Sequence, residues 1–244
     1  DSSISKHKIS GFIENHDIDM SQFIIPVGGY SSFNDFFTRK LRPGARPIDK
    51  DLDSVISPAD GSLMVFPVIK NGMKFFVKSK PFYLEDFLMD KELASRYKNG
   101  ALMVFRLAPS NYHRYHFPVD CAPSSSRLIN GKYESVRPLV YKAGCQPLVT
   151  NKRKIMRLRK ITRGNDIVFV SVGAMWVGSM VETYTTGGIA SKGDEVGYFK
   201  FGGSTIVLLF QDGEVKISAD IVNRSKVGIE TPVKMGEVVA KYIH

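Results

Sequence analysis

Cysteine is scarce in this chain, and long apolar runs are missing from it. Only Cys121 and Cys145 carry a thiol among the 244 residues, and their spacing matches no metal-ligand motif. Two such cysteines favour free thiols in a reducing compartment over a disulfide framework. No apolar run approaches the roughly 18–20 residues that a membrane-spanning helix needs. Any contact with a membrane is therefore expected to be peripheral.

Acidic residues are also in deficit. The chain has 24 Asp and Glu against 34 Lys and Arg, which gives a formal net charge of +10. This imbalance favours a polyanion, an anionic membrane surface or an acidic substrate as partner. Nucleic acid is not expected, because the chain has no helix-turn-helix or zinc signature and its basic segment lacks the spaced aromatics of a stacking platform.

That basic segment runs from Lys152 to Lys160 and interleaves cationic with apolar residues. The pattern predicts an amphipathic strand whose cationic face lies in solvent. The functional alternative is a contact with phospholipid headgroups, where each Lys or Arg near an anionic surface contributes about 1 kcal/mol.

Short apolar stretches separated by Gly, Pro, Asn and Asp dominate the sequence from residue 55 onward. Few of them are separated by helices, so a parallel doubly wound sheet is disfavoured. We expect one domain over 1–244 with a β-rich α+β fold, mainly antiparallel sheets and a few short helices. One helical segment is expected near 84–97, and the predicted strands are Val55–Ser57, Leu63–Val68, Lys74–Val77, Leu102–Leu107, Ile167–Val172, Met175–Val177, Thr205–Phe210 and Val215–Ser218.

An amphipathic helix is predicted to begin near residue 33. Residues 32–35 read as a capping box, and Phe33, Phe36 and Phe37 follow at helical spacing. The Pro-Gly pair at 43–44 ends the helix. We expect this helix to pack its aromatic stripe on the core rather than to insert into a membrane.

The most informative segment is Gly202-Gly203-Ser204-Thr205, which runs directly into the apolar stretch 206–210. Glycine permits unusual backbone dihedrals and removes the side-chain bulk that would block attack on a carbonyl. The structural alternative is a tight turn that Ser204 and Thr205 stabilise by local hydrogen bonds. The chemical interpretation is a nucleophilic serine that attacks another molecule or its own preceding peptide bond.

Histidine is concentrated in one place. Two of the five histidines, His113 and His116, lie beside an arginine within Tyr112–Pro118. Upstream, Asp60 lies in a Pro/Gly-bounded turn, where Asp before Gly by itself indicates only turn chemistry.

Together with Ser204, Asp60 and His116 supply the acid, base and hydroxyl of a nucleophilic triad. A serine hydrolase of the α/β type is disfavoured. Ile206 stands where the G-x-S-x-G motif needs its last glycine, and a strand rather than a helix follows.

Several motifs occur in a characteristic order along most of the chain: 33–48, 57–61, 105–109 leading into 112–118, 172–174 with 177–179, 192–199 and 202–205. In this order and spelling they resemble the phosphatidylserine decarboxylases, a family of pyruvoyl-dependent enzymes. The Gly-Gly-Ser-Thr form resembles most the branch that includes many eukaryotic members.

The resemblance implies a zymogen that cuts itself autocatalytically. Asp60 would orient His116, His116 would take the proton from Ser204, and the resulting oxyanion would attack the carbonyl of Gly203 to give an ester. Elimination would then leave a dehydroalanine that hydrolyses to a pyruvoyl group formed from Ser204. The implied products are a β chain, 1–203, and a pyruvoyl-bearing α chain, 204–244.

For the mature protein the resemblance implies a lyase of phospholipid biosynthesis. It would decarboxylate phosphatidylserine to phosphatidylethanolamine through a Schiff base, with the pyruvoyl group as electron sink and no metal. A general acid with a pKa near neutrality must protonate the product carbanion. We assign this step to His113, with His116 as the rival.

The implied partners are phosphatidylserine, a peripherally bound anionic membrane and the second cleaved chain as a heterodimer, and association into homo-oligomers stays open. One alternative is the same cofactor acting on a free amino acid such as tryptophan. Another is a non-catalytic β-module, because 192–196 and 231–236 resemble turns of lipoyl or biotinyl modules. That alternative predicts a modifiable Lys234 and an intact backbone at Ser204.

Two segments depart from the family pattern. Arg137, in Ser135–Pro138, stands where many members have Asn in a Val-Asn-Pro sequence, and 122–126 differs from the usual apolar strand. Both are expected on the substrate side. They therefore bear on the headgroup environment more than on the chemistry.

Overall fold

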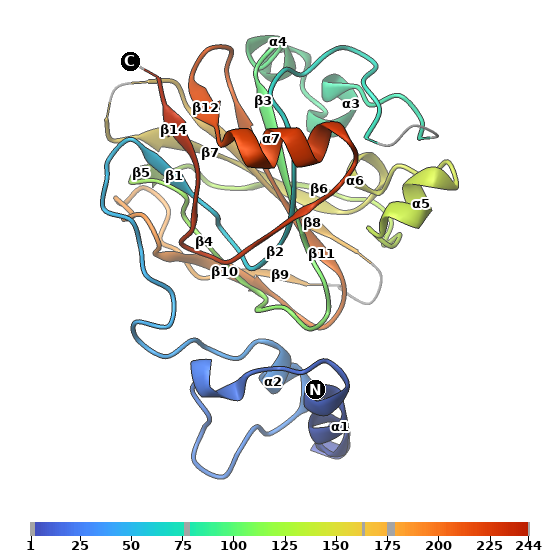
Figure 1. Cartoon of the computed structure of the whole chain (residues 1–244), viewed down its shortest axis with the longest axis vertical. Coiled ribbons are helices and arrows are strands. Elements are labelled where there is room, and N and C mark those ends of the chain that lie inside the picture. Colours follow the sequence, from blue (N-terminus) through green and yellow to red (C-terminus); the bar gives the residue numbers. More distant parts are fainter. Residues whose placement is uncertain (1–2, 76–78, 163, 175–178, 244) are drawn as a thin grey trace.

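The body of the molecule is a set of antiparallel sheets packed face to face, with the N-terminal segment at one end (Figure 1). The structure is a computed structural model that describes residues 3–75, 79–162, 164–174 and 179–243. The largest sheet has eight strands, in the order β13 (Thr231–Val233), β2 (Gly61–Phe66), β3 (Ala101–Leu107), β11 (Ser204–Phe210), β8 (Ile167–Gly173), β7 (Arg153–Lys160) and β5 (Cys121–Pro123), with β6 (Arg127–Ile129) also paired to β7.

Two three-stranded sheets cover one face of the large sheet. Their strands are β1 (Ser54–Ile56), β14 (Val238–Tyr242) and β12 (Val215–Ile217) in one, and β4 (Arg114–His116), β10 (Glu195–Phe199) and β9 (Met180–Glu182) in the other. Every pair of these named strands is antiparallel. The expected β-rich α+β fold is confirmed.

Short helices cover the opposite face of the large sheet, and a further helix lies against β2. The first group is α3 (Leu84–Leu88), α4 (Lys91–Arg96), α5 (Pro138–Lys142) and α6 (Pro147–Thr150); the further helix is α7 (Ala219–Lys226). Alternating strand residues divide between the two faces. In β11, Ile206 and Leu208 belong to the core between the sheets, whereas Val207 and Leu209 pack toward the helices.

The N-terminal segment folds around its own aromatic cluster. It contains η1 (Ser3–His7), α1 (Lys8–Asn15), η2 (Met20–Gln22) and α2 (Phe33–Phe37). The Ser32 hydroxyl caps α2 by accepting from the Asp35 amide at 3.1 Å. Phe36 and Phe37 are completely buried, but they belong to this separate aromatic cluster and not to the cores around the large sheet, on which the stripe was expected to pack. The helix is shorter than predicted and ends before Arg39.

Several sequence-based boundaries are corrected. The helical segment near 84–97 is two helices, because Met89 adopts a left-handed φ of 49° and Asp90 caps the second. The strand predicted at Lys74–Val77 is wrong at 74–75, which form no strand; residues 76–77 and the predicted strand Met175–Val177 lie outside the described residues. Sequence analysis missed β4, β5, β6, β9, β10, β13 and β14, which have only three to five residues each.

The basic segment forms β7 as predicted, but its cations do not share one solvated face. Arg153 is 2% exposed and donates to backbone carbonyls, including those of Phe87 and Asn151. Lys154 pairs with Glu182 at 2.9 Å. In the described ranges, no helix is long and apolar enough to cross a membrane.

Candidate active site

Ser204 is the first residue of β11, at the centre of the large sheet, and it is completely buried. Its backbone is in register with Leu107 of β3 on one side and Gly173 of β8 on the other. By strand alternation its side chain belongs to the face that includes Ile206, toward the two small sheets. The two flanking strands therefore hold the predicted nucleophile in a fixed position.

The two glycines before Ser204 lie just outside the hydrogen-bonded strand β11. Gly202 has a φ of +140°, a conformation that L side chains rarely adopt, so glycine is required there. Gly203 follows next to the side chains of Ala174 and Val136, and a Cβ built on it would lie 3.7 Å from each. The peptide bond between Gly203 and Ser204 thus lies where a glycine-shaped turn enters a rigid strand.

His113 is the hydrogen-bonding partner of Ser204. Its Nδ1 atom lies 3.3 Å from Ser204 Oγ, and its Nε2 atom lies 3.0 Å from the carbonyl oxygen of Ala108. A carbonyl oxygen can only accept, so Nε2 carries the proton and Nδ1 presents a lone pair to the serine. This tautomer makes His113 the acceptor of the Ser204 hydroxyl.

Burial keeps the His113 ring neutral. The side chain is 0% exposed, and removal from water lowers its pKa from 6.5 to about 3, with the nearby Arg39 charge acting in the same direction. A neutral imidazole with a free lone pair is the form that can take a proton from a serine hydroxyl.

The predicted aromatic helix positions this histidine. The ring of Phe37 in α2 stacks on the His113 ring, with centroids 3.9 Å apart and planes at 24°. Arg39 donates to the carbonyl oxygens of Ser110 and Asn111, on the loop that leads to His113. The N-terminal segment therefore fixes both the ring and the backbone of the candidate base.

Asp60 forms its hydrogen bonds with residues other than His116 and Ser204. It accepts two hydrogen bonds from Arg46, at 3.1 and 2.6 Å, and a third from the backbone amide of Met235 at 2.8 Å. The side chains of Asp60 and Arg46 are 11% and 6% exposed, so this is a buried ion pair. It joins the chain segment after α2 to the loop between β13 and β14.

His116 has its ring nitrogens occupied as well. Its Nδ1 atom lies 2.8 Å from the carbonyl oxygen of Gly193 and must donate to it. Its Nε2 atom therefore accepts from the Tyr112 hydroxyl at 3.0 Å. Burial lowers the pKa of His116, with the Gly193 hydrogen bond opposing that shift.

The structure thus brings Ser204 together with His113, whereas Asp60 and His116 have other hydrogen-bond partners. Strand alternation explains the difference between the histidines. His113 continues the series of Tyr115 and Phe117, which point into the core between the sheets, and His116 falls on the other series.

A cavity of about 330 Å³ opens beside the Gly203–Ser204 bond. Its described lining comes from the end of β3, the loop before α5 and the glycine turn. These residues are Arg106, Leu107, Ala108, Pro109, Ser135, Val136, Arg137, Ala174 and Gly203. The volume lies in the range of pockets that bind small molecules.

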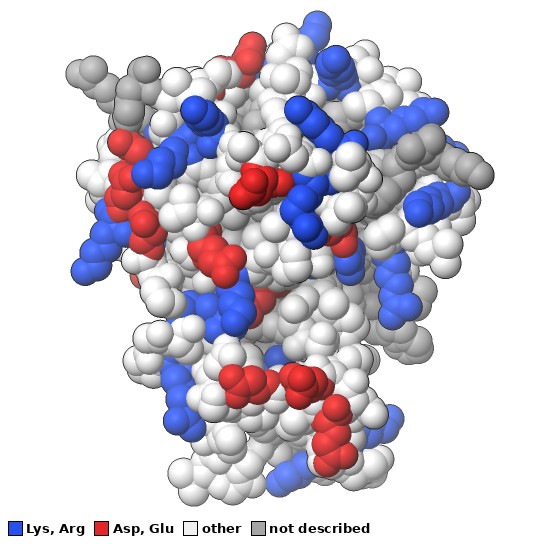
Figure 2. Space-filling model, viewed as in Figure 1, with Lys and Arg blue, Asp and Glu red and all other residues white. Residues whose placement is uncertain are grey.

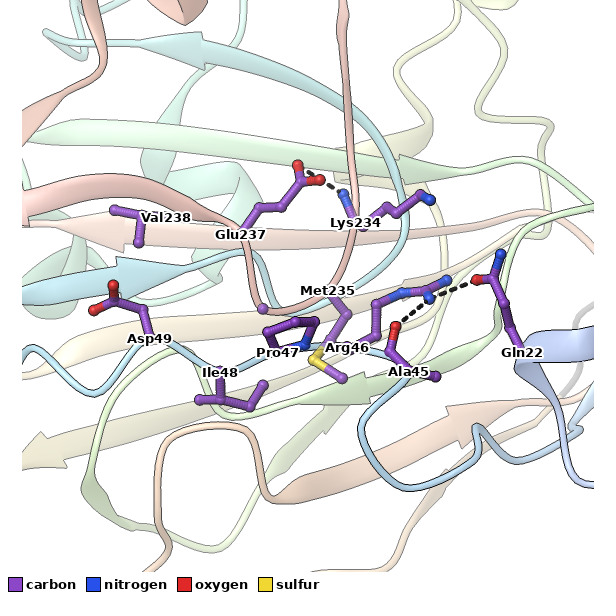
Figure 3. A pocket seen from close by; sticks show the side chains of 11 residues that line it. Gln22, Ala45, Arg46, Pro47, Ile48, Asp49, Lys234, Met235, Glu237 and Val238 are labelled. Carbon is purple, nitrogen blue, oxygen red and sulfur yellow. Dashed lines mark hydrogen bonds between the residues drawn. The ribbon is translucent and has the colours of Figure 1, made fainter.

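A larger cavity of about 630 Å³ lies elsewhere, between residues 45–49 and 234–238 (Figure 3). Arg46 lines it and also donates to Gln22 at 2.6 Å, so this cavity adjoins the Asp60 ion pair rather than Ser204. Lys234 is on its wall, with its backbone amide bonded to Glu237 at 3.1 Å.

Sequence reasoning missed four side chains that hold the candidate site together: Phe37, Arg39, Arg46 and Tyr112. Two signals could have found them. The segment directly after the aromatic helix carries several arginines, including Arg39 and Arg46. A buried arginine needs several hydrogen-bond acceptors, so such arginines are expected to link parts of the chain together. Tyr112 immediately precedes the histidine pair.

Comparisons with known proteins identify the family of the chain. A sequence model described as "Phosphatidylserine decarboxylase" matches residues 33–241. The phosphatidylserine decarboxylase proenzyme of Fusobacterium nucleatum subsp. nucleatum is 45% identical over 233 residues, or 96% of this chain and 77% of the relative. The proenzymes of Chlamydia trachomatis serovar L2b and Chlamydia felis are each 41% identical, over 98% and 97% of this chain and 79% of each relative.

Proposed function

The chain belongs to the phosphatidylserine decarboxylase family, and we propose that it is a proenzyme that cuts itself between Gly203 and Ser204. It is a carboxy-lyase that converts phosphatidylserine to phosphatidylethanolamine and carbon dioxide. The comparisons do not favour a free amino acid as substrate or a lipoyl-like module. The observation that carries the self-cleavage proposal is the contact between Ser204 Oγ and His113 Nδ1.

In the proposed cleavage, His113 takes the hydroxyl proton of Ser204 on Nδ1. The oxygen attacks the carbonyl carbon of Gly203, and the Gly203–Ser204 amide becomes an ester when the Ser204 nitrogen takes the proton from His113 and leaves as an amine. A base then removes the Cα proton of Ser204, and the bond between Cβ and Oγ breaks, which forms the Cα=Cβ double bond and releases the carboxylate of Gly203. Hydrolysis of the remaining dehydroalanine yields ammonia and the new N-terminal ketone of 204–244.

The residues at this position fit the pyruvoyl group that the family implies. Ser204 supplies its three carbon atoms, water supplies the ketone oxygen, and the cavity beside Gly203 gives a primary amine a route to it. The adjacent Thr205 hydroxyl is buried with no protein hydrogen-bond partner among the described residues, so it is available to a neighbouring carbonyl. When present, the group accepts electrons as carbon dioxide leaves.

His113 has a second proposed role in the mature protein. Since it contacts Ser204, it lies beside the position at which the product carbanion must gain a proton. Nε2–H donation to Ala108 keeps the ring oriented throughout. The same nitrogen that accepts the serine proton thus faces this position, although burial holds its pKa, about 3, below the near-neutral value expected of a general acid.

Asp60 and His116 are proposed to support the site rather than to exchange protons with Ser204. Asp60 holds Arg46 and the Met235 amide, and His116 joins Tyr112 to Gly193. The sequence-based alternative, in which Asp60 and His116 activate Ser204, requires both side chains to exchange their present partners. Single variants separate the two assignments.

We further propose that the protein attaches peripherally to an anionic membrane and that its two cleaved chains stay together. The net charge of +10 supports the first point. Figure 2 shows Lys and Arg interspersed with Asp and Glu over the face in view, so the attraction is spread rather than concentrated there. The second point is supported by β11, which follows the cleavage site and lies between β3 and β8 of the other chain.

The proposal is tested with Ser204→Ala beside Ser171→Ala, a matched change of a buried serine on the neighbouring strand β8. Wild type and Ser171→Ala should yield two chains and release carbon dioxide from phosphatidylserine vesicles. Ser204→Ala should remain one chain and release none. Cleavage of Ser204→Ala at Gly203 would refute the assignment.

A further inference from the structure

We propose that Arg137 binds the phosphodiester of the phosphatidylserine substrate at the cavity beside the cleavage site. The inference rests on the proposed function, because it assigns a headgroup subsite to that same reaction centre. In this chain, Arg137 would favour a phospholipid over a free amino acid.

The cavity wall places Arg137 close to the reacting position. Val136 is 5% exposed, and its side chain lies beside Gly203, so the segment that carries Arg137 is anchored at the bond to be cut. Arg137 follows directly and lines the same cavity. In phosphatidylserine the amino nitrogen is joined to phosphorus through only two carbons and one oxygen. An amine at residue 204 therefore requires its phosphodiester within this cavity.

The two arginines of the cavity differ in their ion pairing. Among its described lining residues, only Arg106 and Arg137 are charged. Arg106 directs its guanidinium at Glu230, with Nε donating to Oε1 at 2.9 Å and Nη2 to Oε2. Arg137 forms no ion pair with any described residue and is exposed. Its planar fork is therefore available to two oxygens of a phosphodiester.

The surroundings of Arg137 suit the rest of a phospholipid. Pro138 begins α5 immediately after it, and this helix projects from the edge of the sheets in Figure 1. Leu139 in α5 is 75% exposed. A charged group at the cavity and an apolar side chain beyond it match the order of headgroup and acyl chains in the substrate.

The test uses monomeric dihexanoyl phosphatidylserine with purified, fully cleaved protein. Arg137→Gln should raise KM about tenfold to a hundredfold, as expected for a lost charged hydrogen bond. Arg137→Lys keeps the charge but loses the planar fork, so its KM should lie between those of wild type and Arg137→Gln. The matched control is Arg96→Gln, an exposed arginine on α4 outside the cavity lining, which should leave KM unchanged.

A binding measurement separates this subsite from the chemistry. Dihexanoyl phosphatidylglycerol has the phosphodiester but no amine, and Arg137→Gln should weaken its binding by the same factor in calorimetry. Unchanged KM and binding would overturn the proposal. A defect seen only on vesicles would assign Arg137 to neighbouring lipid headgroups and would also overturn it. Failure of the protein to cleave or decarboxylate at all would instead refute the proposed function.

Discussion

The Nδ1 atom of His113 faces the Oγ atom of Ser204 at 3.3 Å, while Nε2 of the same ring is bonded to the carbonyl oxygen of Ala108. This pair couples the strand β11 to the loop before β4. It identifies which of two neighbouring histidines can receive a proton from the serine without rearrangement.

Replacing His113 should therefore block self-cleavage more than replacing His116. Loss of a general base slows a reaction by typically 10²–10⁴-fold. His113→Ala should slow the appearance of the cleaved chains by about that factor, measured by intact mass during expression and refolding. His116→Ala should cleave more slowly than wild type but much faster than His113→Ala. The opposite order would restore the relay through Asp60 and His116.

The low pKa of His113 predicts a pH-dependent stability of the uncleaved protein. The unfolded ring binds a proton near pH 6.5, whereas the buried ring does so only near pH 3. The unfolded state thus binds more protons between these values. The contribution of His113 to the free energy of unfolding is therefore fully present above pH 6.5 and is lost as the pH falls toward 3.

Thermal unfolding of Ser204→Ala at a series of pH values measures this effect. The midpoint temperature of unfolding should decrease as the pH is lowered from 6.5 to 4. The added change His113→Gln should make this decrease with pH less steep. An identical slope in both proteins would mean that His113 does not titrate as its burial requires.

The ion pair between Asp60 and Arg46 should contribute to stability. Asp60→Asn leaves the buried Arg46 charge without its carboxylate, and breaking a buried pair in this way costs about 3–5 kcal/mol. Urea unfolding in the Ser204→Ala background measures the loss. Adding Arg46→Met should recover part of it, because the unpaired charge is then removed.

The same double variant distinguishes a structural from a chemical role of Asp60. If Asp60 only supports the site, cleavage in a Ser204-containing protein should improve together with stability when Arg46→Met is added. Recovered stability with cleavage still abolished would indicate that the carboxylate acts on the reaction itself.

Binding to anionic vesicles should depend on salt and on the exposed part of β7. Arg157 and Arg159 are exposed. Because each cation near an anionic surface contributes about 1 kcal/mol, replacing either arginine by Gln should weaken vesicle binding about fivefold. Vesicle sedimentation at low salt measures this. Binding that is unchanged from low to high salt would exclude the electrostatic contribution. Arg96→Gln controls for the loss of charge alone.

Much of the fold could be predicted because its central strands are long and apolar. The strands around Leu102–Leu107, Ile167–Val172 and Thr205–Phe210 agree with β3, β8 and β11 within one residue at each end. The seven missed strands are short. Several of them pair with strands that are distant in sequence, as β13 does with β2, so no local pattern marks them.

The candidate site could be predicted in its membership but not in its contacts. Ser204 and His113 were both identified, yet the sequence-based relay joined Ser204 to His116. The strand that places His113 in series with Tyr115 and Phe117 is β4, which has only three residues and is not marked by a local pattern. The ion pair of Asp60 with Arg46 could not be predicted, because it depends on how the N-terminal segment crosses the loop after β13.

The most direct test of the account is the intact mass of the purified protein under denaturing conditions, before and after reaction with a hydrazine probe. We expect two chains that divide at Gly203–Ser204, with the smaller chain, 204–244, carrying one hydrazine-reactive carbonyl. A single uncleaved chain that never reacts with the probe, while His113 and Ser204 are intact, would contradict it.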